Sequence, residues 1–216
     1  MEWLHSRHDR ARRTDDQVHQ TRVFLVAIGL LALFPCSSPA AEGPSFSVES
    51  GDVRVVVPLK PGGAFEAKTS SLTGSLTLGM SKPAPLSGEL TVDLATLDTG
   101  IDLRNHHLRE KYLEVQKGPG FSRAVLAEIL LTDAAGEGFQ GPTGFTGTLL
   151  IHGVRRPVKG TAEIRRVGTS VRVEAKCPLD LGDFAITPPE YLGVGVASKV
   201  MLKVSLTAKP GAAAGK

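Results

Sequence analysis

The residues best suited to chemistry gather between Asp98 and Val115, in the stretch DTGIDLRNHHLREKYLEV, which holds two adjacent histidines among arginines and carboxylates. Zinc-binding histidines on a helix stand four residues apart, whereas adjacent side chains point about 100° apart. His106 and His107 therefore do not face one ion together. After residue 41 the sequence has only one other histidine, His152, and one thiol, Cys177. We predict neither a metal site nor an enzyme cofactor.

Catalysis is disfavoured on similar grounds. Nucleophilic catalysis needs a serine, threonine or cysteine beside a base that a third group orients. His107 or His152 would supply the base, but no serine stands in a G-x-S-x-G context, and no phosphate-binding glycine loop follows a strand pattern. We predict a protein that is not an enzyme and has no catalytic residues. A hydrolase or isomerase that uses His107 with a carboxylate is the weaker alternative.

The same stretch carries a helical pattern. Between Leu103 and Val115, Leu108, Tyr112 and Val115 are spaced as i, i+4 and i+7, which places them on one face of a helix. Gly100 allows the chain to leave the preceding strand. The pattern predicts one short amphipathic helix, and such a helix between two strands of a barrel commonly lies across an opening.

Elsewhere the chain alternates apolar and polar residues, the period of a strand with one face in an apolar interior and one in water. The four clearest cases are Asp52–Leu59, Glu89–Leu94, Val171–Cys177 and Val200–Thr207. Glycine and proline clusters separate further candidate strands. These further strands are Ala64–Lys68, Leu72–Leu78, Arg123–Leu131, Gly144–Ile151 and Val158–Arg166.

This number of strands limits the choice of fold. Strands with one solvent-exposed face and short connections pair antiparallel, and eight or more in one domain imply a sandwich or a closed barrel. Only 5% of the residues are aromatic, and the inward positions carry Val, Leu and Ala. The interior of a barrel of roughly eight strands is either filled by side chains or open for one small ligand. Small aliphatic linings favour the open interior.

The N-terminus predicts export. Val23–Phe34 is an apolar run of 12 residues, too short for a membrane-spanning helix of roughly 17–25 residues. Small residues follow at Ser38–Ala41, so we interpret residues 1–41 as a signal peptide with a long n-region and expect a periplasmic or secreted protein. An uncleaved membrane anchor is the alternative. Lipid anchoring at Cys36 is disfavoured because Phe and Pro precede it where lipoprotein processing sites carry small residues.

The charge balance argues against one class of partner, and the cysteine count argues against an internal disulfide. From Glu42 onward the chain has 11 Lys, 9 Arg and 18 acidic residues, a formal charge of +2. This balance, with scattered Lys and Arg, argues against a nucleic-acid partner. If cleavage falls after Cys36, only Cys177 remains and no internal disulfide forms. The stability of the domain must then come from its apolar core.

Three motifs resemble the YceI-like family. Thr99–Val115 resembles that family's TG pair, R-D-x-H-L core and pair of bulky residues, and Gly147–Val158 resembles its G-x-L-x-I-H-G-V-x-x-P-V hairpin. Leu181–Ile186 resembles its D-F-G-I segment. The resemblance covers roughly Phe46–Ala208. Asn105 stands where the family usually has Asp, Leu113 sits near a usual Phe, and Ala185 replaces the glycine of D-F-G-I.

The resemblance implies an all-β fold, a lipocalin-like antiparallel β-barrel of about eight strands whose apolar cavity holds a polyisoprenoid chain. A polar head group would lie at the mouth, where Arg104, Asn105 and His107 would donate hydrogen bonds to a quinone carbonyl or a pyrophosphate. Aliphatic and aromatic residues at inward strand positions are the candidates for contacts with the chain. These lumen candidates are Val55, Val57, Leu90, Val92, Phe145, Leu149, Ile151, Val173, Leu202 and Val204.

The sequence therefore predicts a signal peptide over residues 1–41, a barrel domain over residues 46–208 and a disordered tail over residues 209–216. The predicted function is non-enzymatic carriage or sequestration of a small hydrophobic lipid, a polyprenyl chain or prenylated quinone, with transient contact with a membrane surface. The principal alternative is a barrel with a solid core that acts as an interaction module in the cell envelope. That alternative predicts bulky side chains meeting across the lumen and no continuous cavity.

Overall fold

The computed structural model describes residues 43–134, 138–191 and 194–211. The predicted signal peptide, including Cys36, lies outside these ranges, as do the last five residues of the predicted tail. Within the described ranges, no helix is both long enough and apolar enough to cross a membrane.

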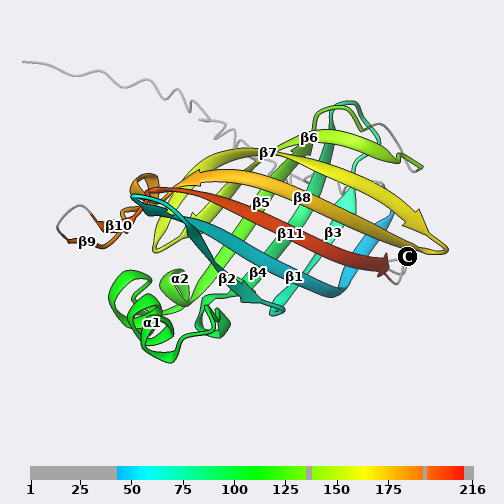
Figure 1. Ribbon diagram of the computed structural model, residues 1–216. Helices are drawn as coiled ribbons and strands as arrows, with labels where there is room; N and C mark the ends of the chain where they lie inside the picture. The colour runs from blue at the N-terminus through cyan, green and yellow to red at the C-terminus, as the bar shows by residue number, and fades with distance from the viewer. Residues whose placement is uncertain (1–42, 135–137, 192–193, 212–216) are drawn as a thin grey trace, which may run out of the picture. The chain divides into compact units, whose positions relative to one another are not determined.

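Antiparallel strands form a closed barrel (Figure 1). Strand β1 pairs with β11 along most of its length and with β3 at its beginning, and these two pairings join the ends of the sheet. The predicted antiparallel barrel of about eight strands is thus confirmed. Its strands are β1 (Ser45–Lys60), β3 (Leu72–Leu78), β4 (Ala84–Asp93), β5 (Arg123–Leu131), β6 (Gly141–Ile151), β7 (Val154–Val167), β8 (Ser170–Asp180) and β11 (Lys199–Pro210).

Three shorter strands complete the sheet. Strand β2 (Ala64–Thr69) pairs with the second half of β1, next to the segment that β3 pairs with. Strands β9 (Glu190–Tyr191) and β10 (Val194–Val196) form a small extension from the end of β1. All nine predicted strands are present, and β3 and β5 have the predicted bounds.

The other seven predicted strands differ from the sequence prediction at one or both ends, and β1 and β11 are the instructive cases. Strand β1 begins at Ser45 rather than Asp52, and a register shift between Val48 and Ser50 interrupts its ladder with β11. This bulge breaks the alternation on which the prediction depended. Strand β11 continues to Pro210, so the predicted tail boundary at residue 209 falls inside a paired strand.

The segment between β4 and β5, called here the mouth insert, carries short helical turns at one end of the barrel (Figure 1). The predicted short helix at the opening is present, but it does not extend to Val115. The α-helix ends at His107, a wider turn follows in which Leu113 N–H donates to Leu108 O at 2.9 Å, and Glu114 is left-handed at φ +50°. The elements are η1 (Leu94–Thr96), α1 (Asp102–His107), η2 (Leu108–Tyr112), η3 (Val115–Lys117) and α2 (Pro119–Ser122).

Backbone hydrogen bonds fasten the mouth insert to the barrel at two places. Asp98 and Lys68 exchange N–H···O bonds of 2.8 Å, which joins the start of the insert to β2. Gly153 N–H donates to Gly120 O at 2.8 Å, which joins α2 to the turn between β6 and β7. The insert is therefore held across the barrel end from two sides.

Candidate ligand-binding site

An apolar cavity of about 580 Å³, called here the outer chamber, occupies the barrel end next to the mouth insert. Ligand sites for small molecules typically have 300–1,000 Å³, so the chamber is large enough for one. Inward residues of β1 and β11 form part of its wall, and the insert contributes Ile101, Leu103, Leu108 and Leu113. The opening therefore has an aliphatic rim as well as an aliphatic interior.

A second apolar cavity of about 220 Å³, the inner chamber, lies deeper in the barrel. Phe145, Val173 and Val204 are among its lining residues, as is the thiol-bearing Cys177. Burial raises the pKa of the Cys177 thiol, so the thiol stays neutral beside the apolar wall. These two cavities contradict a barrel whose core is packed solid.

Every lumen residue predicted from the sequence lines one of the two chambers. The outer chamber receives Val55, Val57, Val92 and Ile151, and the inner chamber receives Leu90, Phe145, Val173 and Val204. Leu149 and Leu202 line both chambers.

Two of the three predicted head-group residues reach the mouth. Arg104 and His107 both line the outer chamber. The guanidinium carbon of Arg104 lies 4.3 Å above the centre of the Phe65 ring, and the guanidinium has no hydrogen-bond acceptor or carboxylate partner in the part of the chain that the structure describes. Five N–H donors therefore stand at the edge of an apolar chamber, available to a polar head group.

Asn105 is the exception, because its side chain lies buried inside the mouth insert rather than in the cavity. Its carbonyl oxygen accepts from Thr99 N–H at 2.8 Å and from the Thr99 hydroxyl at 2.7 Å, and its amide donates to Asp98 Oδ1 at 2.6 Å. The prediction that Asn105 donates to a ligand is therefore wrong. The Gly100 N–H first and the Asn105 amide second hold the pKa of Asp98 below its usual value.

Comparison with known proteins agrees with this geometry. The model of the YceI-like domain matches residues 46–208. The chain belongs to the YceI-like family. No curated protein matches it. Two solved structures similar to this YceI-like protein are BcnA of Burkholderia cenocepacia and a polyisoprenoid binding domain from Saccharophagus degradans.

These similarities concern the fold. BcnA is 18% identical with a TM-score of 0.59, and the match covers 74% of this chain and 96% of BcnA. The Saccharophagus domain is 16% identical with a TM-score of 0.55, and the match covers 77% of this chain and 98% of that domain. At such identities the two structures show that the YceI-like barrel is shared.

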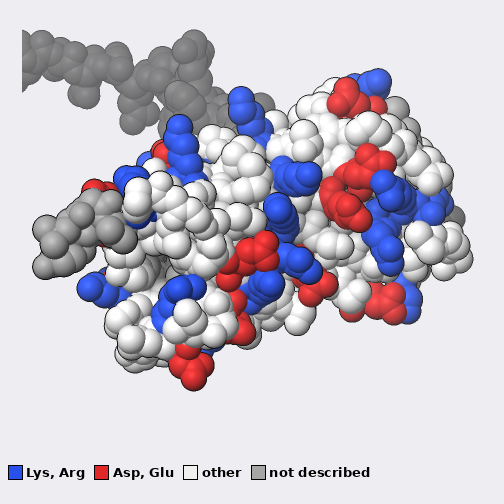
Figure 2. Space-filling view, in the orientation of Figure 1, with Lys and Arg blue, Asp and Glu red and all other residues white. Residues whose placement is uncertain are grey.

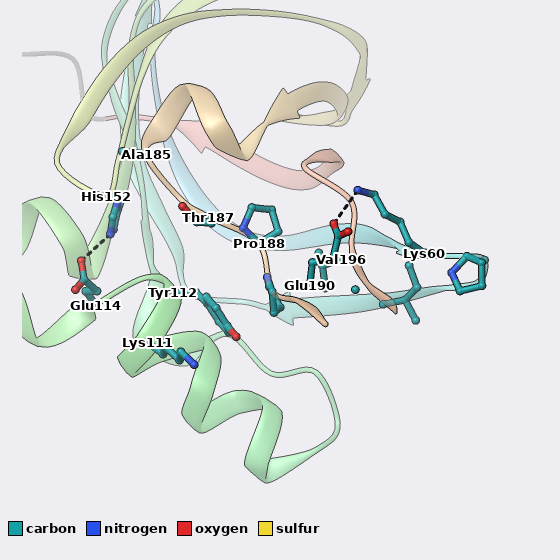
Figure 3. A pocket seen from close by; sticks show the side chains of 15 residues that line it. Lys60, Lys111, Tyr112, Glu114, His152, Ala185, Thr187, Pro188, Glu190 and Val196 are labelled. Atoms are coloured by element: carbon teal, nitrogen blue, oxygen red, sulfur yellow. Dashed lines mark hydrogen bonds and ion pairs between the residues drawn. The ribbon is translucent and has the colours of Figure 1, made fainter. Parts of the chain in front are cut away.

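A recess of about 850 Å³ with both charged and apolar lining residues adjoins the outer chamber of the YceI-like protein (Figure 3). His152, in the turn between β6 and β7, directs Nδ1 at Phe184 O (3.2 Å) and Nε2 at Glu114 Oε2 (3.0 Å). Both partners are hydrogen-bond acceptors. Lys117 first and His152 second hold the pKa of Glu114 below its usual value. The recess thus contains a structural clamp between the insert and the barrel.

In the described part of the chain no carboxylate pairs with His107, as the rival catalytic site would require. Within the described ranges the only recorded contact of the His107 ring is with His106, at 6.0 Å between ring centres. No group of three His, Cys, Asp or Glu side chains positioned to hold a metal ion occurs in those ranges either. Figure 2 shows acidic and basic side chains interspersed over the visible face rather than gathered in a patch of one sign.

Sequence reasoning missed lining residues that come from loops and helical turns of this YceI-like protein. Pro188 and Pro189 line both the outer chamber and the neighbouring recess. Strand alternation identifies inward positions on strands only, so it carries no information about these residues. The apolar face of the mouth insert was the one available indication, and it pointed to Leu108 and Tyr112.

Proposed function

We propose that this YceI-like protein binds an isoprenoid-type lipid in its lumen, with the prenyl chain in the apolar chambers and the polar head at the mouth, and acts as a carrier or sequestering protein. The observation that carries the proposal is the outer chamber itself, an aliphatic cavity of about 580 Å³ open beside the mouth insert. A similar fold from Saccharophagus degradans is described as a polyisoprenoid binding domain.

The energetics of burial favour this ligand class. A prenyl chain is a branched hydrocarbon, and each methylene transferred from water into an apolar site contributes about 0.8 kcal/mol. A few prenyl units therefore support tight binding without a strong polar contact. Arg104 supplies the polar contact that distinguishes one head group from another, because its guanidinium lies at the rim and has no acceptor in the described residues.

The proposal includes export and contact with a membrane. The N-terminal apolar run supports secretion to the periplasm or beyond. A lipid that is insoluble in water has to be exchanged at a bilayer, and the rim of the chamber offers a surface for that contact. Ile101 is 49% exposed and Leu103 is 67% exposed, and both line the chamber. No catalytic step is part of the proposed function.

The test is to purify the protein from its native host, extract it with organic solvent and identify the extract by mass spectrometry. The expected result is a prenyl lipid in stoichiometric amount, together with a higher melting temperature when prenols or quinones are added. The variant Val55→Trp, which fills the outer chamber, should lose the lipid. The variant Arg54→Trp, one residue away on the exposed face of β1, should keep it.

The proposal fails if no prenyl lipid co-purifies and if added prenols and quinones leave the melting temperature unchanged. It also fails if Val55→Trp retains as much lipid as Arg54→Trp in a folded state, because the lipid would then lie outside the lumen.

A further inference from the structure

The two chambers of the lumen meet at two side chains. Of all the lining residues, only Leu149 and Leu202 belong to both cavities. Leu149 comes from β6 and Leu202 from β11. The two cavities therefore adjoin at these two leucines, and we call this boundary the waist.

The sheet topology brings the two leucines together. Strands β6 and β11 are separated by β7 and β8 on one side of the barrel and by β5, β4, β3 and β1 on the other. Inward side chains of well-separated barrel strands converge toward the axis. Leu149 is buried, and Leu202 packs against the cluster that contains it. Both side chains therefore stand at the boundary between the two chambers.

The sizes of the two chambers indicate which hydrocarbon chains would have to pass the waist. The outer chamber, at about 580 Å³, is in the range of complete ligand sites, whereas the inner chamber, at about 220 Å³, is below that range. A short hydrocarbon chain is fully buried in the outer chamber. A longer chain buries its remaining methylenes only if its tail passes the waist, and burial of each methylene strengthens binding.

We propose that Leu149 and Leu202 determine how far a prenyl chain penetrates the lumen, and thereby which chain lengths the protein prefers. This inference rests on the proposed function, because it concerns the same lumen and the same ligand class. Short prenols bind above the waist independently of both leucines. Long prenols bind with an affinity that depends on them.

The test is a titration of wild-type protein and alanine variants with geraniol, farnesol and geranylgeraniol, which carry successively longer chains. Displacement of a fluorescent apolar probe gives the affinities. We expect Leu149→Ala and Leu202→Ala to strengthen geranylgeraniol binding about tenfold relative to geraniol binding, since more of the tail is buried. The matched control is Leu179→Ala, which removes a leucine that lines the outer chamber alone and should shift all three prenols by a similar factor.

Cys177 provides a second readout, because it lines the inner chamber and not the outer one. In a Cys36→Ser background, modification of Cys177 by a small thiosulfonate reports whether the inner chamber is occupied. Geranylgeraniol should slow the modification several-fold, and more strongly in Leu202→Ala than in the wild-type lumen. Geraniol should leave the rate unchanged.

The outcomes separate this inference from the proposed function. If the wild-type protein binds none of the three prenols, the proposed function fails. If it binds them but Leu149→Ala and Leu202→Ala change all three affinities by one common factor, as Leu179→Ala is expected to do, the waist does not select chain length. Protection of Cys177 by geraniol would also overturn the inference.

Discussion

At the scale of single residues, Arg104 is the group that we propose contacts the polar head of a ligand. Its guanidinium lies over the Phe65 ring, at the rim of an apolar chamber, and the described residues offer it no acceptor. An arginine at a barrel rim has two common roles, a contact with a ligand's head group and an ion pair that ties neighbouring elements together. The second role is not realised in the described structure, because no carboxylate approaches it.

The first prediction concerns Arg104→Ala. Hydrogen bonds to charged groups contribute about 1.5–3 kcal/mol, so the variant should bind farnesyl pyrophosphate roughly 10- to 100-fold more weakly than wild type. Farnesol binding should change by no more than about threefold, because burial of its chain is unaffected. Isothermal titration calorimetry measures both. Arg172→Ala, on the exposed face of β8, is the control. Equal losses for the two ligands would contradict a head-group role.

Ala185 is a second residue whose role follows from its backbone. It ends the turn η4 (Leu181–Phe184) in the left-handed conformation, with φ at +56°, at the position where the family usually has glycine. A Cβ atom in that conformation costs roughly 1–2 kcal/mol. Glycine would remove this cost, but part of the gain would be offset because glycine has more conformational freedom in the unfolded chain.

The second prediction is therefore a gain of stability. Ala185→Gly should raise the free energy of unfolding by roughly 0.5–1 kcal/mol, measured by urea denaturation. The matched control is Ala162→Gly on β7, a buried strand position, which should lower that free energy. Destabilisation by both variants would show that the left-handed residue is not strained.

At the scale of elements, the mouth insert is where sequence and structure diverge most. Strand alternation predicted nine strands and every inward residue named from them, because period 2 reports directly which face is buried. The insert has no such simple period. Its helical pattern predicted a helix at the opening, yet Glu114 turns left-handed and Leu113 bonds back to Leu108, so the pattern spans several short turns.

Asn105 shows why the residue roles in the insert were not predictable. A family motif that places a polar residue near a mouth does not reveal which way the side chain points. Here the amide joins Asp98 to Thr99 and so fixes the loop that leads into α1. An aspartate at this position would accept from Thr99 but would be unable to donate to Asp98.

The third prediction concerns the Asn105 amide, which donates a hydrogen bond to Asp98. In Asn105→Asp two carboxylates would face each other, so the melting temperature should fall by several degrees at pH 7. In the wild-type protein the Gly100 N–H and the Asn105 amide lower the pKa of Asp98. The Asp98 carboxylate therefore stabilises the fold at pH values above its ordinary pKa, and this stabilisation is lost as the pH falls through the lowered pKa. The deficit of the variant should shrink toward pH 4, where one carboxyl takes up a proton and becomes a donor.

The control for this charge conflict is the double variant Asp98→Asn, Asn105→Asp, in which donor and acceptor exchange places. It should recover most of the lost melting temperature at pH 7. A deficit that is independent of pH and unrelieved in the double variant would show that the Asp98–Asn105 contact does not hold the loop.

The fourth prediction concerns the exposed rim of the mouth insert. If Ile101 and Leu103 contact a bilayer during lipid exchange, Ile101→Ser with Leu103→Ser should slow transfer of a fluorescent prenol from vesicles about tenfold or more, since two apolar side chains no longer insert. The control pairs Met80→Ser with Val167→Ser. Met80 lies in the loop between β3 and β4 and is 56% exposed, Val167 lies at the end of β7 and is 58% exposed, and neither lines a chamber. Equal slowing by both double variants would contradict a docking role for the rim.

At the scale of the whole molecule, the barrel acts as a container whose wall and opening come from different parts of the chain. The strands supply an aliphatic wall with few aromatic rings, and the insert supplies a rim that is fastened at β2 and at the turn between β6 and β7. The sequence predicted the wall because alternation and composition determine it. It did not predict the division of the lumen, because a waist depends on which leucines meet across the axis.

The most direct test of this account is a crystal structure of the protein grown with geranylgeraniol. We expect continuous electron density from a head group beside Arg104 down the outer chamber, with the tail ending at or beyond Leu149 and Leu202. An empty lumen, or a prenol bound only on the outer surface of the barrel, would contradict the claim that this protein holds a hydrocarbon chain inside its barrel.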